Sequence, residues 1–351
     1  MLGKDSARAA LRSLQQVSEL AVDPARPFYS AEHGEIEAGQ TTDIYFVRTY
    51  ELLDRMGLVA TPVVAEVFAT RAGVACGVEE CLNLLRGRAV EVWALDEGTE
   101  FEPKDVLLRI AGPYGEFGLY ETPLLGFLAS GSGWAAAARE CKRAAGERPV
   151  VCFGARHVHP AAAPAMERAA LVGGVDGVSC ILAAKLAGCE PMGTMPHAVI
   201  LIVGDTVEVA RAYHRLMPPG APRIVLVDTF HDEAEETLRV AEALGKDLYG
   251  VRLDTPGERG GVTPDLVREV RARLDQAGHH DVKVFVSGGI NPPRIVELAA
   301  AGADAFGVGS YISSARPVDM TMDLKVVRGR PIAKRGRIPG LTPSPRLKRR
   351  L

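Results

Sequence analysis

The sequence VKVFVSGGI at residues 282–290 decides the fold of this chain. Its run VKVFV is typical of a strand that is buried on both faces of a parallel sheet, and the glycine pair ends the run. Similar short apolar runs occur at residues 149–153, 177–180, 223–228, 248–254 and 303–308. Amphipathic stretches such as 232–244 and 264–277 separate most of them. Strands that alternate with helices predict a parallel sheet with right-handed crossovers, and about six such units favour a closed or nearly closed barrel over an open doubly wound sheet.

The first third of the chain has a different pattern. Half-buried strands are expected at residues 61–70, 88–95 and 105–112, with a helix around 78–85, and residues 124–145 are helical. The C-terminal tail is basic, rich in glycine and proline, and too short to form a domain. The sequence therefore predicts an α/β chain with an N-terminal α+β sandwich domain over residues 1–121, an irregular TIM-like (β/α) barrel over residues 122–321, and a tail over residues 322–351 that packs back on the first domain.

Composition excludes several classes of protein. Of the 351 residues, 47% are hydrophobic and 24% are charged, as in an average globular protein, and the net charge of −3 argues against a protein that coats nucleic acid. The longest apolar run, at residues 198–203, is too short to span a bilayer, and no secretory signal is visible at the start. The six cysteines include no C-x-x-C pair, so we expect reduced thiols in a cytoplasmic protein.

Two glycine-rich turns follow neighbouring strands at the end of the predicted barrel. A glycine pair lets the backbone approach an anion, and the helix that follows offers unpaired N–H groups. Each turn alone could be no more than a tight bend, but adjacent turns at the last strand ends of a barrel are the usual phosphate site of this architecture. We therefore expect phosphate to bind at Ser287, Gly288, Gly289, Gly307, Gly309 and Ser310.

The remaining strand ends carry polar side chains that would face the same mouth, namely Arg156, His157, Asp228, Thr229, Arg252 and Asp254. Arg252 and Asp254 are two residues apart on a strand and point to the same side, so Asp254 could meet sugar hydroxyls or a magnesium ion, or form a structural ion pair with Arg252. A second carboxylate on the neighbouring strand, Asp228, favours the site. Arg156 suits a planar carboxylate or a phosphate. His197 is expected to begin a helix near the same rim, and alone it is a weak signal.

Several motifs together resemble the nicotinate phosphoribosyltransferase family, in particular its short microbial branch, over essentially the whole chain. They are T-D-x-Y at residues 42–45, E-T-P-L-L at 121–125, G-T-x-x-H at 193–197 and R-x-D at 252–254. The resemblance implies a phosphoribosyltransferase of NAD biosynthesis that forms nicotinate mononucleotide and pyrophosphate from nicotinate and phosphoribosyl pyrophosphate. It also implies a homodimer or larger homo-oligomer whose site is shared between subunits.

The resemblance also assigns roles to residues for which the sequence pattern alone indicates only a loop or a helix cap. It implies that Tyr45 stacks on the pyridine ring beside Asp43, that Glu121 contacts substrate, and that Asp176 is a further site carboxylate. Arg156 would hold the substrate carboxylate or a phosphate, Asp254 the ribose, and the glycine turns the 5′-phosphate. His197 matches the histidine that ATP-using relatives phosphorylate, and the use of ATP is left open.

Departures from the family pattern limit these expectations. Relatives often read R-x-D-S-G-D, whereas Thr255, Pro256 and Gly257 follow Asp254 here, which affects the sugar contacts. Residues 320–351 contain no cysteine, so no zinc is expected. Magnesium should arrive through the pyrophosphate of the substrate, with Asp228 or Asp254 as its protein ligand. Neither nucleic acid nor a membrane is expected as a partner.

Three alternatives to nicotinate transfer stay open at this point. Quinolinate carries a second carboxylate and would need more Arg and Lys residues than Arg156, Lys185 and Arg252. Nicotinamide is another acceptor. A catalytically inactive relative that only binds pyridine nucleotides would keep the glycine turns and lose the groups that act on the leaving pyrophosphate.

Overall fold

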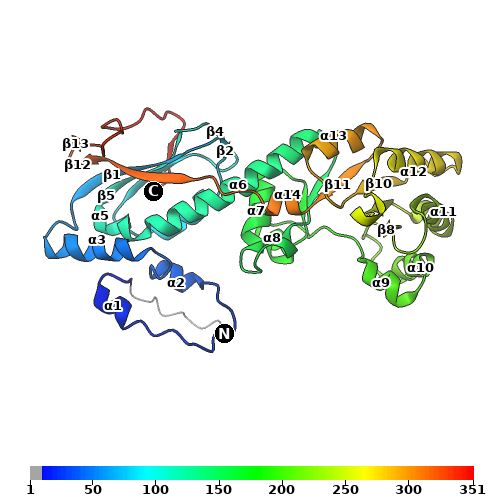
Figure 1. Cartoon of the computed structure of the whole chain (residues 1–351), viewed down its shortest axis with the longest axis horizontal. Helices are drawn as coiled ribbons and strands as arrows, with labels where there is room; N and C mark the ends of the chain where they lie inside the picture. The colour runs from blue at the N-terminus through cyan, green and yellow to red at the C-terminus, as the bar shows by residue number, and fades with distance from the viewer. Residues whose placement is uncertain (1–9) are drawn as a thin grey trace. The chain divides into compact units, whose positions relative to one another are not determined.

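The computed structural model describes residues 10–351, and the chain divides into two compact units (Figure 1). The first unit runs to Gly133 and resumes from Arg316 to Leu351, whereas the second comprises Trp134–Ala315. Helix α6 (Glu121–Ala145) connects them along the chain. Each unit has its own hydrophobic core, so each is described separately.

The first unit is built on an antiparallel sheet. Its order within the described residues is β13-β12-β1-β5-β3-β14, and β2 and β4 form a separate pair. The strands are β1 (Pro62–Ala69), β2 (Gly73–Val74), β3 (Glu91–Ala94), β4 (Glu100–Phe101), β5 (Val106–Pro113), β12 (Met320–Val327), β13 (Arg330–Pro331) and β14 (Lys348–Arg349). The helices are α1 (Leu14–Ser18), α2 (His33–Glu37), α3 (Ile44–Arg55), α4 (Val78–Leu85), α5 (Tyr114–Phe117) and η1 (Gly118–Tyr120).

Alternation along β1 decides which face of this sheet meets the core. Val63, Ala65 and Val67 are buried against α4 and the first part of α6. Glu66 points to the other face, where Arg109 of β5 donates to it at 2.8 Å. The tail covers this ion pair, because the Thr342 N–H also donates to Glu66 at 3.2 Å. The tail is therefore an integral layer of the first unit, paired through β12 with β1 and through β14 with β3.

The second unit is built on a parallel sheet whose order, within the described residues, is β7-β6-β11-β10-β9-β8. The strands are β6 (Val150–Cys152), β7 (Gly177–Val178), β8 (Ile224–Leu226), β9 (Gly250–Leu253), β10 (Lys283–Val286) and β11 (Ala305–Val308). The helices are η2 (Ala155–His157), α7 (Ala163–Gly173), α8 (Ile181–Leu186), α9 (His197–Val203), α10 (Thr206–Leu216), α11 (Glu233–Leu244), η3 (Gly245–Asp247), η4 (Gly257–Arg259), α12 (Pro264–Gln276), α13 (Pro292–Ala300) and α14 (Ser310–Ser313).

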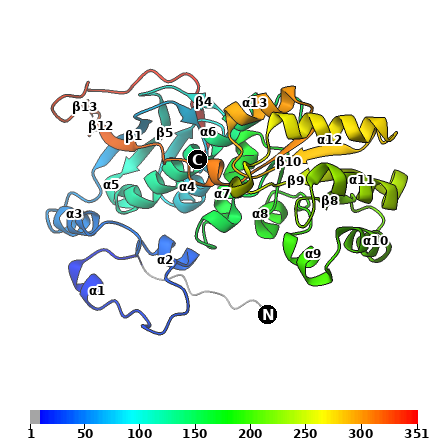
Figure 2. The same ribbon diagram turned by 45° about the vertical axis from the view of Figure 1, so that its right-hand side comes forward.

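Strands β6 and β11, the first and last of the unit, pair in the middle of this sheet. Strands β7 and β8 lie at its two ends and do not pair in the described part of the chain. Helices α10, α11 and α12 follow one another along the outside of this sheet (Figure 2). Near the start of the unit, small residues bring α6 close to α7, since a Cβ at Gly173 would lie 2.4 Å from the Ala135 carbonyl oxygen.

The predicted fold class is confirmed: an antiparallel α+β unit accompanies a parallel α/β unit. Closure of the parallel sheet into a barrel stays a prediction, since β7 and β8 end the described sheet and the chain between them forms helices and loops. Among residues 10–351 no helix is both long enough and apolar enough to cross a bilayer.

Candidate active site

A cavity of about 470 Å³ lies at the carboxyl ends of the barrel strands. Parallel strands place their carboxyl ends on one edge of the sheet, so the loops that follow them converge there. The lining residues come from the loops after β6, β7, β9, β10 and β11 and from the segment that leads into α9. They are Phe153, Ala155, Arg156, His157, Ser179, Gly193, Thr194, Pro196, His197, Arg252, Asp254, Ser287, Gly288, Gly289, Gly307, Gly309 and Ser310.

The two glycine turns lie side by side in this cavity, after the paired strands β10 and β11. A Cβ at Gly307 would lie 2.4 Å from the Phe153 ring and 3.1 Å from the Ser287 Cβ, so only glycine fits between the turns. Gly288 and Gly289 have φ of +85° and +63°, which favour glycine. Nothing lies within 4 Å of the Cβ position of Gly289, and backbone N–H groups at such turns can receive an anion.

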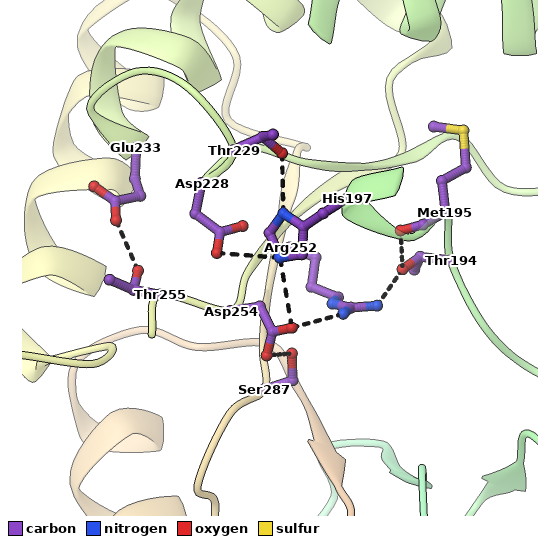
Figure 3. A network of polar contacts seen from close by, with 10 residues as sticks. All are labelled: Thr194, Met195, His197, Asp228, Thr229, Glu233, Arg252, Asp254, Thr255 and Ser287. Atoms are coloured by element: carbon purple, nitrogen blue, oxygen red, sulfur yellow. Dashed lines mark hydrogen bonds and ion pairs between the residues drawn. The ribbon is translucent and has the colours of Figure 1, made fainter. Parts of the chain in front are cut away.

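Beside the turns, Arg252 organises a network of polar side chains (Figure 3). Its guanidinium donates to Asp254 Oδ2 at 3.0 Å and to the Thr194 hydroxyl. The Ser287 hydroxyl donates to Asp254 Oδ1 at 2.8 Å, which ties this carboxylate to the first glycine turn. Both oxygens of Asp254 are therefore fixed, and a negative charge is held at the mouth of the cavity.

His197 begins α9 and lies between two carboxylates (Figure 3). Its Nδ1 is 3.0 Å from the Thr229 hydroxyl, and its Nε2 is 3.7 Å from Asp228 Oδ2 and 4.0 Å from Asp254 Oδ2. Asp228 is buried beneath the cavity, and neither of its oxygens has a hydrogen-bond partner among the described residues. Burial raises the pKa of Asp228 to about 6, and nearby His197 opposes this rise.

Arg156 and His157 occupy the turn after β6 and line the same cavity. Arg156 is exposed and has no hydrogen bond or ion pair among residues 10–351, so its guanidinium is available to a ligand. His157 packs against the second turn, because a Cβ at Gly309 would lie 2.9 Å from its Cε1 atom.

Sequence reasoning missed several lining side chains, among them Phe153, Ser179 and Thr194. Phe153 directly follows β6 and its ring centre lies 5.6 Å from the Arg252 guanidinium, Ser179 follows β7, and Thr194 accepts from Arg252. Ser179 could have been found by the rule that singled out the other strand ends, and Thr194 lies inside the G-T-x-x-H motif.

Asp176 does not lie at this site, contrary to expectation. It precedes β7 and therefore lies at the amino end of the strand, at the edge of the sheet opposite the cavity. Its carboxylate accepts from the Val150 N–H at 2.8 Å and from Lys142 at 2.9 Å. These contacts connect β6 and α6, so Asp176 is a structural residue.

Asp43, Tyr45 and Glu121 belong to the first unit. Asp43 accepts from the Thr122 hydroxyl at 2.8 Å, and the Tyr45 side chain is exposed. Glu121 lines a different cavity, of about 520 Å³, between α3, the start of α6 and β12. Burial raises the pKa of Glu121 to about 7, with Asp323 adding to the rise and Lys334 opposing it.

Two protein-family models match this chain, and together they cover most of both units. Residues 43–132 match the model of the quinolinate phosphoribosyl transferase N-terminal domain, and residues 134–323 match that of its C-terminal domain. A crystal structure of nicotinate-nucleotide pyrophosphorylase from Pyrococcus furiosus aligns with a TM-score of 0.86 and 48% identity, covering 89% of this chain and 82% of that chain. Human nicotinic acid phosphoribosyltransferase aligns with a TM-score of 0.71 over 86% of this chain and 77% of that chain, and at 22% identity this match shows the fold alone.

Curated relatives carry similar names. Nicotinate phosphoribosyltransferase pncB2 of Mycobacterium tuberculosis is 34% identical over 249 residues, which are 68% of this chain and 52% of that protein. This chain thus spans about half the length of the first curated relatives that it matches. The family resemblance predicted from the motifs is confirmed: the chain belongs to the quinolinate phosphoribosyl transferase family.

Proposed function

We propose that this chain transfers the phosphoribosyl group of phosphoribosyl pyrophosphate to nicotinate, forming nicotinate mononucleotide and pyrophosphate. One observation carries the proposal: two adjacent glycine turns, able to hold a sugar phosphate, line the same cavity as the fixed carboxylate of Asp254. Phosphoribosyl pyrophosphate carries phosphate, and its ribose ring develops positive charge during the reaction. An anion site next to a carboxylate suits both of these features.

The chemistry requires stabilisation of charge rather than a general base. Displacement at the anomeric carbon builds positive charge on the ribose ring, which Asp254 would stabilise electrostatically. The pyridine nitrogen is already a nucleophile, so the protein must mainly position it. Arg156, the exposed guanidinium of the cavity, would bind the carboxylate of nicotinate, because its fork can bind both oxygens.

A magnesium ion fits this site best at Asp228. Both oxygens of Asp228 lack hydrogen-bond partners in the described part of the chain, whereas those of Asp254 are taken by Ser287 and Arg252. No group of three or more His, Cys, Asp or Glu residues among residues 10–351 is arranged to hold a metal, so the substrate pyrophosphate would supply most ligands. When bound, magnesium would stabilise the negative charge on the leaving pyrophosphate.

Quinolinate is the second candidate acceptor, and the name of the matching family model favours it. The cavity argues against it, because a second ring carboxylate would need a second available cation. Arg252 is already paired with Asp254, and Lys185 is paired with Glu190 and does not line the cavity. Among the lining arginines and lysines this leaves Arg156 for one carboxylate.

The purified chain should be assayed with phosphoribosyl pyrophosphate, magnesium and nicotinate, quinolinate or nicotinamide in turn. We expect pyrophosphate release and a mononucleotide product with nicotinate. Turnover of quinolinate alone, with release of carbon dioxide, would reject the choice of acceptor. Tight binding of nicotinate mononucleotide without pyrophosphate release from any acceptor would support the inactive relative. The same assay with and without ATP tests the ATP-coupled form.

The exposed apolar residues of α8 and α9 support a proposed homo-oligomer. Ile181 and Leu186 are 70% and 68% exposed, and Ile202 is 84% exposed. Large exposed apolar side chains are typical of an interface. Sedimentation velocity tests this part, and a purely monomeric chain at micromolar concentration would contradict it.

A further inference from the structure

A buried glutamate connects two of the loops that line the cavity. Glu167 lies on α7, and its side chain is fully buried. Its Oε1 accepts from the Ala155 N–H at 3.2 Å and from the Ser179 hydroxyl at 2.9 Å, and its Oε2 accepts from the Cys180 N–H at 2.6 Å. Ala155 begins the turn after β6, and Ser179 and Cys180 follow β7.

The contacts indicate an ionised carboxylate that is held by the loops themselves. Three donors point at its two oxygens, so both oxygens accept. Glu167 has no ion-pair partner within residues 10–351, and its charge is therefore balanced by these N–H and O–H dipoles. Hydrogen bonds to a buried charge are stronger than neutral ones, and their loss is costly. The two loops thus depend on Glu167 for their position.

Neighbouring packing makes the β6 turn rigid around this contact. A Cβ at Gly154 would lie 2.7 Å from the Met166 methyl group, so α7 presses directly against the start of the turn. The next two residues of the turn, Arg156 and His157, line the cavity. A shift of the Ala155 backbone therefore moves the Arg156 guanidinium.

We propose that Glu167 is a positioning residue for the part of the site that binds the acceptor. It fixes the Arg156 turn relative to Ser179 and does not itself touch substrate. This inference rests on the proposed function for the identity of the acceptor. It separates the site into two parts. The loops after β6 and β7 are held by Glu167, whereas the glycine turn after β10 is held through Ser287 and Asp254.

The test is Glu167→Gln, which keeps the shape of the side chain and replaces one acceptor oxygen by a donor. We expect the KM for nicotinate to rise on the order of tenfold, from the loss of a charge-assisted hydrogen bond, while the KM for phosphoribosyl pyrophosphate stays within about twofold. Hydrogen exchange at the amides of Ala155 and Cys180 should become faster in the variant.

Glu236→Gln is the matched control, because Glu236 is equally buried in the same unit but pairs with Arg239 on α11 and lines no part of the cavity. It should leave both KM values unchanged. If Glu167→Gln does not fold, Ser179→Ala replaces it, with the same direction of change and a smaller size. When both variants fold, the double variant should be no worse than Glu167→Gln alone.

Equal changes in both KM values, or unchanged amide exchange, would overturn the proposal. If the parent protein turns over no pyridine carboxylate, the proposed function fails separately, and the exchange measurement still decides whether Glu167 holds the loops.

Discussion

The two units each contain a cavity of similar size and opposite character. The cavity of the barrel, about 470 Å³, is lined by glycine turns and by polar side chains that bond to one another. The cavity of the first unit, about 520 Å³, is lined mainly by apolar side chains such as Leu53, Val63 and Leu324, with Glu121 as its one carboxylate. The two cavities are therefore similar in volume but differ in the polarity of the residues that line them.

The comparison concerns carboxylates that have hydrogen-bond partners and carboxylates that are buried without them. Arg252 and Ser287 hold Asp254 in place at the barrel cavity. Asp228 and Glu121 lack such hydrogen bonds in the described part of the chain, and burial is the main cause that raises the pKa of each, to about 6 and about 7 respectively.

The largest effect expected is that of Asp254→Asn, which tests whether the paired carboxylate is functional. The neutral side chain would lose the negative charge at the mouth of the cavity, and turnover should fall on the order of a thousandfold. Steady-state kinetics measures this. Asp265→Asn is the control, since Asp265 is 93% exposed on α12. A loss of less than about tenfold would favour the alternative that Asp254 and Arg252 form only a structural ion pair.

Asp228→Asn tests the buried carboxylate that lies behind His197 and has no hydrogen-bond partner in the described part of the chain. We expect turnover to fall about a hundredfold at pH 8, because a charged group that is important in the transition state is removed. Steady-state kinetics measures this, and a loss of less than about tenfold would contradict this role.

The same substitution has a stability effect whose sign follows from linkage. Between the usual pKa of 3.8 and the raised value of about 6, the native state holds a proton that the unfolded state has lost. The parent therefore loses stability as pH rises through this window, and the variant does not. In the absence of metal, the melting temperature of the variant relative to that of the parent should be higher at pH 8 than at pH 4.

Gly307→Ala tests the close approach of the two glycine turns. The new Cβ would meet the Phe153 ring at 2.4 Å, so the second turn must shift. The KM for phosphoribosyl pyrophosphate should rise about tenfold, and unfolding should become easier by about 1–3 kcal/mol. Gly126→Ala on α6 is the control, because nothing lies within 4 Å of its Cβ position. An unchanged KM would show that these turns do not bind the phosphate.

Sequence alone was enough to predict that many of these residues meet at one cavity of the second unit. The glycine turns and the Arg252–Asp254 pair follow buried strands, and parallel strands bring their carboxyl ends to one edge. Asp176 was misplaced because only the family resemblance assigned it to the site, whereas it precedes the strand that begins at Gly177 and so lies at its amino end. Glu167 could not be predicted, since a glutamate between Met166 and Arg168 on a helix looks like a surface residue, and only tertiary packing buries it.

The smallest effect is expected from Glu121→Gln, which tests the carboxylate of the apolar cavity in the first unit. Burial raises the pKa of Glu121 from 4.5 to about 7, so the native state binds a proton that the unfolded state releases between these values. The stability of the parent should therefore fall as pH rises from about 4.5 to 7 and change little beyond.

The Glu121→Gln variant should not lose stability over this pH range, because its neutral side chain carries no charge to bury. Thermal midpoints should be similar for parent and variant at pH 4.5, and the variant should be higher by a few degrees at pH 8, about 1 kcal/mol in free energy. Glu37→Gln, at an exposed position of α2, should show no such divergence. If the Glu121 variant instead loses stability at pH 8, the carboxylate has a partner that compensates its burial, and the contrast between the two cavities disappears.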